Sequence, residues 1–194
     1  MKIRELRKKE SHVKLIKAAF ALFSSRGISI TRTIDVARKA GVSHGTVFAH
    51  FPTKEDLIVE VIGEYSKRVV ERIHELVKLG VGVRDVLKAH IECLSEYEAY
   101  YARLVIEGPI LPPSARTALI GIQSAISHHL AIAAENEMEK GKIKEIPIYM
   151  LFNTWLGLIH HYVVNRDLFA PQESVLSSRG EELINHFMVL LNPK

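Results

Sequence analysis

The sequence has almost no cysteine. Its single cysteine, Cys93, excludes a disulfide within the chain and any cysteine-rich metal site, and it is typical of a reducing compartment. The first nine residues are mostly charged, so a secretory signal is not expected. We therefore expect a cytoplasmic protein that needs no metal or other cofactor.

The motifs of common enzyme classes are missing as well. The sequence contains no phosphate-binding loop, Gly-x-Gly-x-x-Gly, nucleophile elbow or His-Glu-x-x-His. His128-His129 and His160-His161 are adjacent pairs, and neighbours on a helix diverge by about 100°, so neither pair chelates a metal from one face. The sequence predicts a protein that is not an enzyme.

Long uninterrupted apolar runs are also lacking. Residues 146–164 approach the length of a membrane span, but Pro147, Asn153, His160 and His161 interrupt them. We interpret this stretch as a buried or dimer-forming helix, and we expect no contact with a membrane.

What the sequence does contain is a predicted helix-turn-helix at residues 31–54. Thr31 or Thr33 is placed to cap the first helix. Gly41 ends that helix, because a residue without a Cβ adopts the left-handed conformation at little cost. Small residues at this turn, such as Ala37, allow the two helices to pack closely.

The second helix of this motif, residues 44–51, has an unusual exposed face. Ser43 caps it, Pro52 cannot continue it, and Thr53 is placed to cap the next helix. Its outer residues are short or polar rather than strong helix formers: Ser43, His44, Gly45, Thr46 and His50. They suit a helix that enters the major groove of DNA by its N-terminal end. A plain corner between helices in an all-α protein is the alternative.

The charge distribution favours DNA. The chain carries 26 Lys and Arg against 22 Asp and Glu, a net charge of +4. Residues 1–54 hold 12 of the basic and 3 of the acidic residues, which is +9, whereas residues 55–194 hold 14 and 19, which is −5. A polyanion that binds the N-terminal end is the simplest reason for this asymmetry.

Residues 14–57 resemble the DNA-binding domain of the tetracycline-repressor (TetR) family of bacterial regulators. The matching segments are IKAAFALFSSRG, DVARKAGVSHGTVFAHF and KEDL. The resemblance covers about a quarter of the chain, and the remainder agrees with the family only in length and helical pattern. It implies base contacts at the start of the second helix and phosphate contacts from His50 and Lys54.

Two residues depart from the family pattern. Phe48 stands where the family usually has Tyr, so a hydroxyl that would bond a phosphate is missing, although the ring can still pack on backbone sugars. Arg32 stands where a capping Thr or Ser is usual, and an Arg there opposes the helix dipole, which a nearby phosphate would explain. The predicted DNA-binding residues are Arg32, Thr33, Ser43, His44, Gly45, Thr46, Phe48, His50 and Lys54.

Helical periodicity continues to the end of the chain, and no strand pattern or internal repeat is found. We expect an all-α protein of about nine helices, with a DNA-binding domain at residues 1–53 and a helical ligand-binding and dimerisation domain at 54–194. A basic arm precedes the first helix and could follow the DNA backbone. A long helix joins the two domains. The expected helices are 11–25, 31–40, 44–51, 53–79, 83–95, 96–107, 114–140, 147–167 and 174–191.

The last two helices are apolar around much of their circumference. This predicts burial against a twofold mate in a four-helix interface, although completing the bundle's own core is the alternative. A single helix-turn-helix reads few base pairs, which favours the dimer. The predicted interface residues are Phe152, Trp155, Ile159, Tyr162, Leu183, Ile184, Phe187, Met188 and Leu191.

A set of polar and aromatic residues falls on body helices that should face inward. An apolar cavity with a few polar groups is typical of small-molecule sites, and the resemblance implies an effector pocket in this region. For any one of these residues, a place in the packed core is an equally good interpretation. The candidates are His90, Cys93, Tyr97, Tyr100, Tyr101, Leu119, Ile122, Gln123, Ile126, Met150, Asn153 and His161.

These observations lead to one functional hypothesis and two alternatives. The hypothesis is a homodimeric repressor that binds a near-palindromic operator in double-stranded DNA and is released by a small, largely apolar effector. The alternatives are an architectural DNA-binding protein without an effector and an enzyme built on a helical bundle.

Overall fold

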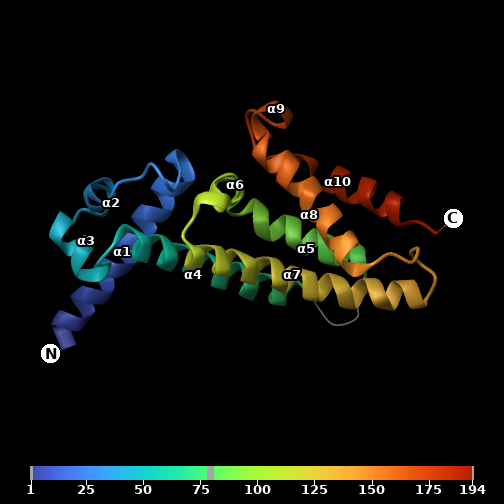
Figure 1. Cartoon of the computed structure of the whole chain (residues 1–194), viewed down its shortest axis with the longest axis horizontal. Helices are drawn as coiled ribbons and strands as arrows, with labels where there is room; N and C mark the ends of the chain where they lie inside the picture. Colours follow the sequence, from blue (N-terminus) through green and yellow to red (C-terminus); the bar gives the residue numbers. More distant parts are fainter. Residues whose placement is uncertain (1, 78–80, 194) are drawn as a thin grey trace. The chain divides into compact units, whose positions relative to one another are not determined.

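The computed structural model describes residues 2–77 and 81–193, and all regular structure in these ranges is helical. Ten α-helices and one short 3-10 helix, Gly108–Ile110, follow one another along the described chain without a strand (Figure 1). The predicted all-α class is confirmed. The chain divides into two compact units, one of Met1–Ser66 with Arg103–Leu119 and the other of Lys67–Ala102 with Ile120–Lys194.

The first unit contains α1 (Lys2–Arg26), α2 (Thr33–Ala40), α3 (His44–His50) and the start of α4 (Lys54–Leu76). Its core is apolar and fully enclosed, because each helix turns one stripe inward. The residues that fill it include Leu15, Ala19, Phe23, Val36, Ala37, Val47, Phe51, Leu57 and Val61. The predicted packing of the helix-turn-helix is therefore confirmed.

The turn and the caps of α3 and α4 form as predicted. Gly41 lies at φ 68°, in the left-handed region, and its backbone N–H bonds the end of α2. The Ser43 hydroxyl caps α3 by accepting from Thr46 N at 3.1 Å. Thr53 and Asp56 then exchange hydrogen bonds at the start of α4, with Asp56 N donating to Thr53 Oγ1 at 3.1 Å.

Two predictions about the first helices are wrong. α1 begins at Lys2 rather than Ser11, because Lys, Arg and Glu are good helix formers and no glycine or proline precedes Ser11. The expected basic arm is therefore helical. The N-cap of α2 is Arg32, without a side-chain hydrogen bond. Thr31 instead donates to Gly27 O at 2.6 Å.

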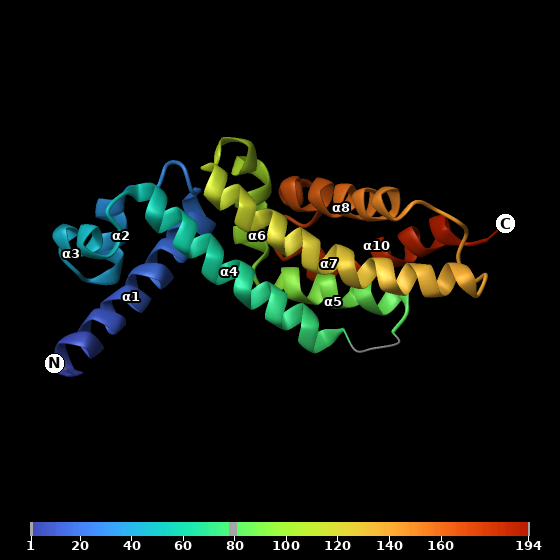
Figure 2. The same ribbon diagram turned by 60° about the horizontal axis from the view of Figure 1, so that its bottom comes forward.

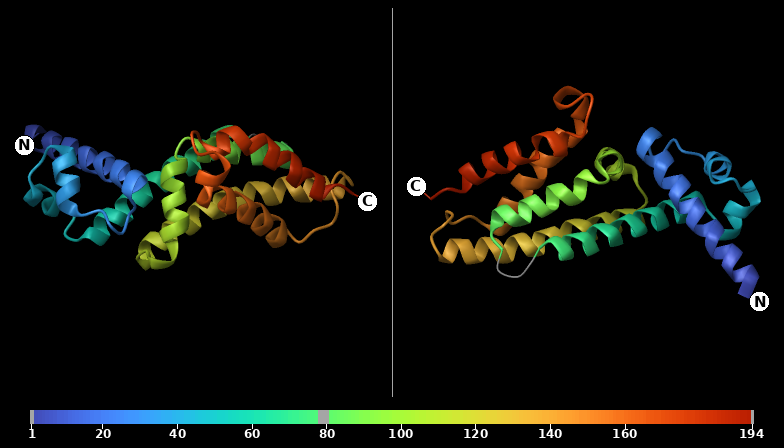
Figure 3. Two further views of the ribbon diagram at one scale, coloured as in Figure 1. Left: turned by 90° about the horizontal axis from the view of Figure 1, so that it is seen from above. Right: turned by 180° about the vertical axis from the view of Figure 1, so that it is seen from behind.

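The second unit contains α5 (Val83–Ser95), α8 (Ile148–Val164), α9 (Arg166–Phe169) and α10 (Val175–Leu191). It also holds parts of α4, α6 (Glu98–Glu107) and α7 (Pro113–Glu139). α10 packs against α5 and α8, as Figures 2 and 3 show.

Two residues fix this packing of α10, Glu98 and Gly180. Buried Glu98 accepts hydrogen bonds from Ser174 Oγ, Val175 N and Leu176 N, and so holds the first turn of α10. Gly180 allows close approach to α5, because a Cβ there would lie 2.6 Å from a methyl carbon of Ile91.

One helix near the end of the chain is shorter than expected. The helix predicted to run from Pro147 to Asp167 ends at Val164, and α9 follows as a separate short helix. The long α4 is helical to Leu76, and its expected end at Leu79 lies outside the described residues. By length and composition α7 would suffice to cross a membrane, but the core helices of soluble proteins pass the same test.

The compact units also divide the chain differently from the predicted boundary at residue 53. Residues 103–119 join the first unit because Glu107 accepts hydrogen bonds from Ile28 N at 2.9 Å and Ser29 N at 2.7 Å. These contacts hold the end of α6 to the loop after α1. The two hydrogen bonds join residues that are separated by 79 and 78 positions in the sequence, so no local sequence pattern predicts them.

Candidate DNA-binding and ligand sites

The exposed start of α3 is arranged by hydrogen bonds among its own short side chains. The hydroxyls of Ser43 and Thr46 lie 2.8 Å apart, and the Ser43 hydroxyl also accepts from Thr46 N. Gly45 is exposed between them. With little side-chain bulk at this end, a base edge can approach the helix backbone closely.

His44 is held in place by the neighbouring helix. Its Nε2 lies 2.9 Å from Thr33 Oγ1, and its ring packs at a centroid distance of 4.9 Å from the ring of Phe48. Phe48 is 46% exposed although it is a large apolar side chain. An exposed aromatic ring on the outer face of α3 suits contact with a partner rather than the core. Arg32 is exposed at the start of α2.

His50 and Lys54 are bound within the first unit. Ser11 Oγ lies 2.8 Å from His50 Nε2. Burial lowers the pKa of His50, and the nearby charges of His12 and Lys8 lower it further. Lys54 Nζ donates to Ser29 O. Burial also lowers the pKa of Lys54, against the opposing effect of Glu107.

Glu107 is a functional candidate that the sequence did not single out. Burial raises the pKa of its carboxyl, but the hydrogen bonds from Ser29 and Ile28 outweigh burial, and the pKa falls below its usual value. The carboxylate lies against Gly27, where φ is +115° and an added Cβ would lie 2.8 Å from Glu107 Oε1.

Three of the polar residues predicted to line an effector pocket have hydrogen-bond partners elsewhere in the body. His90 Nδ1 accepts from Trp155 Nε1 at 3.0 Å, and Tyr101 Oη lies 2.7 Å from His160 Nε2. Burial, with a smaller contribution from His160, lowers the pKa of His90 to about 3. Cys93 Sγ lies 3.6 Å from Val69 O, and burial raises the pKa of this thiol to about 12.

The other candidates for the pocket separate by exposure. Tyr100, Ile122 and Ile126 are buried, and Tyr97, Leu119 and Gln123 are half-buried. The expectation that all of them face inward is wrong for three residues on α8, which are exposed: Met150, Asn153 and His161. His160 faces inward in place of His161, because consecutive residues point about 100° apart on a helix. Leu119 falls in the first unit.

The residues predicted to form the dimer interface are mostly part of the protomer's own core. Six of the nine are buried: Trp155, Ile159, Leu183, Ile184, Phe187 and Leu191. Trp155 and Phe187 pack ring to ring at a centroid distance of 5.2 Å. Phe152, Tyr162 and Met188 are half-buried. The predicted residues were therefore wrong as an exposed surface, because both helices bury their most apolar stripe internally.

The histidine pairs do not gather with other metal-binding side chains. In residues 2–77 and 81–193, no three His, Cys, Asp or Glu side chains converge as metal ligands. His129 Nε2 lies instead 2.9 Å from His74 Nδ1. The pKa of His129 is lowered by burial and then by the neighbouring histidines.

The first unit is a helix-turn-helix with a short-chained, polar outer face, and the other described helices form a helical body. Residues 15–61 match the sequence pattern of bacterial regulatory proteins of the tetR family. The match to this family in sequence is confined to the N-terminal segment, and the fold of the chain is that of solved TetR-family regulators.

Three similar proteins illustrate the relation. The transcriptional repressor KstR2 of Rhodococcus jostii is 31% identical over 44% of this chain and 41% of its own length. A regulator from Saccharomonospora viridis, solved with choline, has a TM-score of 0.79 and 18% identity over 96% of this chain and 100% of its own. FadR of Bacillus subtilis, solved with stearoyl-CoA, has a TM-score of 0.71 and 18% identity over 91% and 97%.

The similarity in fold extends over nearly the whole chain, whereas the similarity in sequence is found mainly at the N-terminal end. The chain matches about two fifths of the length of curated relatives such as KstR2 and the fatty acid metabolism regulator of Bacillus subtilis. The matched family consists of bacterial regulatory proteins, and KstR2 is a transcriptional repressor.

Proposed function

We propose that this protein is a homodimeric, cytoplasmic transcriptional repressor that binds a near-palindromic operator and is released by a small, largely apolar effector. The observation that carries the proposal is the outer face of α3, where Ser43, Gly45 and Thr46 leave a low, polar surface at the helix start. Such a surface fits base edges in the major groove.

The surplus of basic residues in the same unit supports DNA as the partner. Residues 1–54 carry the net charge of +9 already noted, and Arg32, Arg38 and Lys39 are exposed on or beside α2. Contacts from such residues to phosphates position a recognition helix, whereas the short side chains of α3 read the bases.

The dimer would use the outer sides of α8 and α10 rather than the residues that the sequence predicted. Large apolar side chains are exposed there: Tyr149 is 66% and Met150 48% exposed on α8, and Val189 is 66% and Leu190 44% exposed on α10. Two such helices from each protomer would give a four-helix interface with twofold symmetry. That symmetry requires two similar operator half-sites.

The effector part of the proposal is supported by similar proteins of known structure. The similar proteins solved with stearoyl-CoA and choline bind small molecules. Here, however, the polar side chains of the body hydrogen-bond one another, as in the pairs His90 with Trp155 and Tyr101 with His160. These pairs support the second candidate, a DNA-binding protein without an effector, because the polar groups in them already have partners within the protein.

Selection of bound duplexes from a random pool tests the DNA-binding part. We expect enrichment of an inverted repeat whose half-sites lie about one helical turn apart. Absence of any enriched sequence, in a protein that is folded, would contradict sequence-specific repression.

Mass spectrometry of small molecules released from the denatured protein distinguishes the two candidates. A retained apolar molecule that lowers operator affinity when added back supports the repressor with an effector. Protein that releases nothing, and whose DNA affinity no small-molecule library changes, supports the architectural alternative.

A further inference from the structure

The N-terminal half of α1 is longer than the core of the first unit requires. Residues 4–10 are exposed without exception, whereas the buried residues of α1 begin at Leu15. Even the apolar Leu6 is 58% exposed. Packing therefore does not explain why the chain holds this charged segment as a helix.

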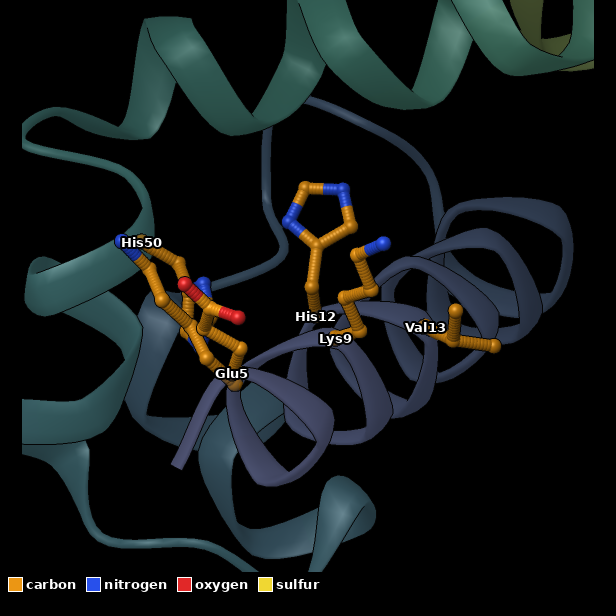
Figure 4. Close-up of a pocket in the computed structure, with 6 residues that line it drawn as sticks. Glu5, Lys9, His12, Val13 and His50 are labelled. Carbon is orange, nitrogen blue, oxygen red and sulfur yellow. The ribbon is translucent and has the colours of Figure 1, made fainter. Parts of the chain in front are cut away.

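A groove runs along this segment and ends at the last residue of α3. It has a volume of about 670 Å³, and Glu5, Lys8, Lys9, His12 and Val13 of α1 line it together with His50 (Figure 4). The lysines and histidines are four basic side chains against the single carboxylate of Glu5. The groove thus continues the surface of the recognition helix with a basic wall.

These basic groups lie close together, and Glu5 is the one acidic side chain among the residues that line the groove. Burial lowers the pKa of His50, and the charges of His12 and Lys8 lower it further. The three side chains therefore lie close enough for their positive charges to repel one another. His12 Nε2 lies 3.5 Å from Glu60 Oε1 of α4. In the described part of the chain, neither Lys8 nor Lys9 forms an ion pair. An anion in the groove would remove this repulsion.

We propose that this groove binds a phosphate of the DNA backbone that flanks the bases read by α3. Lys8 and Lys9 supply the positive charge, and the helical form of α1 holds them beside His50. The inference rests on the proposed function, because α3 must first lie in the major groove. It adds a contact from α1 that increases affinity without reading sequence.

The test replaces both lysines with glutamine, K8Q/K9Q, and measures binding to a mixed-sequence duplex of about 40 base pairs over a range of salt concentrations. Both side chains are exposed, so the fold should be unaffected. Each lost phosphate contact should reduce the slope of log affinity against log salt by about 0.9. At about 0.1 M salt this corresponds to about eightfold weaker binding.

Two further variants serve as controls. K8R/K9R keeps the charge and should bind like the wild type. K140Q/K142Q removes the same charge from exposed positions after α7 and should leave the salt slope unchanged. Equal slopes for K8Q/K9Q and K140Q/K142Q would overturn the phosphate site.

The failures are distinguishable. A wild-type protein that does not bind the duplex at low salt contradicts the proposed function itself. A wild-type protein that binds, with K8Q/K9Q unaffected, contradicts only the groove. If K8Q/K9Q keeps its duplex affinity but loses binding to phosphatidylcholine vesicles containing phosphatidylserine, the anion is a lipid headgroup and the inference is wrong.

Discussion

Among single residues, Glu107 and Gly27 show how one contact can join distant parts of the chain. The Glu107 carboxylate accepts hydrogen bonds from the N–H groups of Ile28 and Ser29 in the loop after α1, and Gly27 leaves room for it. Lys54 takes the carbonyl of Ser29 in the same loop. The loop therefore has its polar backbone groups bonded by side chains from two other helices, which fixes where α2 begins.

Glu107→Gln should weaken this loop, because an amide offers one acceptor oxygen where the carboxylate offers two. We expect the free energy of unfolding to fall by about 1–3 kcal/mol, measured by urea unfolding with circular dichroism. Gly27→Ala should also destabilise, through its positive φ and the short distance to Glu107.

Gly63→Ala is the matched control for Gly27→Ala. Gly63 lies within α4 with no atom within 4 Å of an added Cβ, so the substitution should stabilise by up to about 1 kcal/mol. A similar loss of stability in both alanine variants would show that the left-handed turn and the Glu107 contact are not the cause.

His90 should make stability depend on pH. Its pKa is about 3 in the folded protein and 6.5 in the unfolded chain, so between these values only the unfolded chain binds the proton. Stability is therefore complete above pH 6.5 and falls as pH drops toward 3, by about 1.4 kcal/mol per pH unit. Burial lowers the pKa of His160 in the same direction.

Chemical unfolding at about pH 7 and pH 5 measures this loss. His90→Gln keeps an acceptor for Trp155 but cannot take up the proton, so its stability should change less between the two conditions. If the variant and the wild type lose stability equally, His90 is not the group responsible.

Among the elements, α3 and α4 are expected to make different contacts with DNA: α3 with the bases and the start of α4 with a phosphate. Thr46→Ala removes a hydroxyl and leaves the Ser43 cap on the backbone N–H intact. We therefore expect T46A, and likewise H44A, to change which sequences are preferred. Lys54→Ala should weaken binding to all sequences and reduce the salt slope by about one unit.

Fluorescence anisotropy with selected and random duplexes checks these expectations. Because Lys54 also bonds Ser29, the stability of K54A must be measured alongside. Equal losses on selected and random DNA for all three variants would contradict the separate roles.

For the whole molecule, assembly depends on which side of the last helices remains exposed. Val189→Glu and Leu190→Glu place a charge on the proposed dimer surface, where burial of an unpaired carboxylate is costly. We expect monomers by light scattering and a loss of operator affinity, because two heads no longer bind together. Ile132→Glu on α7, where Ile132 is 52% exposed, is the control. Dimers that survive both substitutions would exclude this surface.

The local chemistry of the helix-turn-helix was readable from the sequence. The left-handed Gly41 and the Ser43 and Thr53 caps all occur as predicted. These features depend on residues within about one helical turn, where backbone conformation and side-chain type decide the outcome. The surplus of positive charge in residues 1–54 follows directly from the residue counts.

Only the tertiary structure decided which apolar side of α8 and α10 faces inward. Both helices are apolar around much of their surface, so periodicity alone did not separate Trp155, which is buried, from Tyr149, which is exposed. For the same reason the sequence assigned His161 rather than His160 to the interior. The bonds of Glu107 likewise join residues far apart in the chain. Such choices follow from which helices meet, and that is a property of the folded chain as a whole.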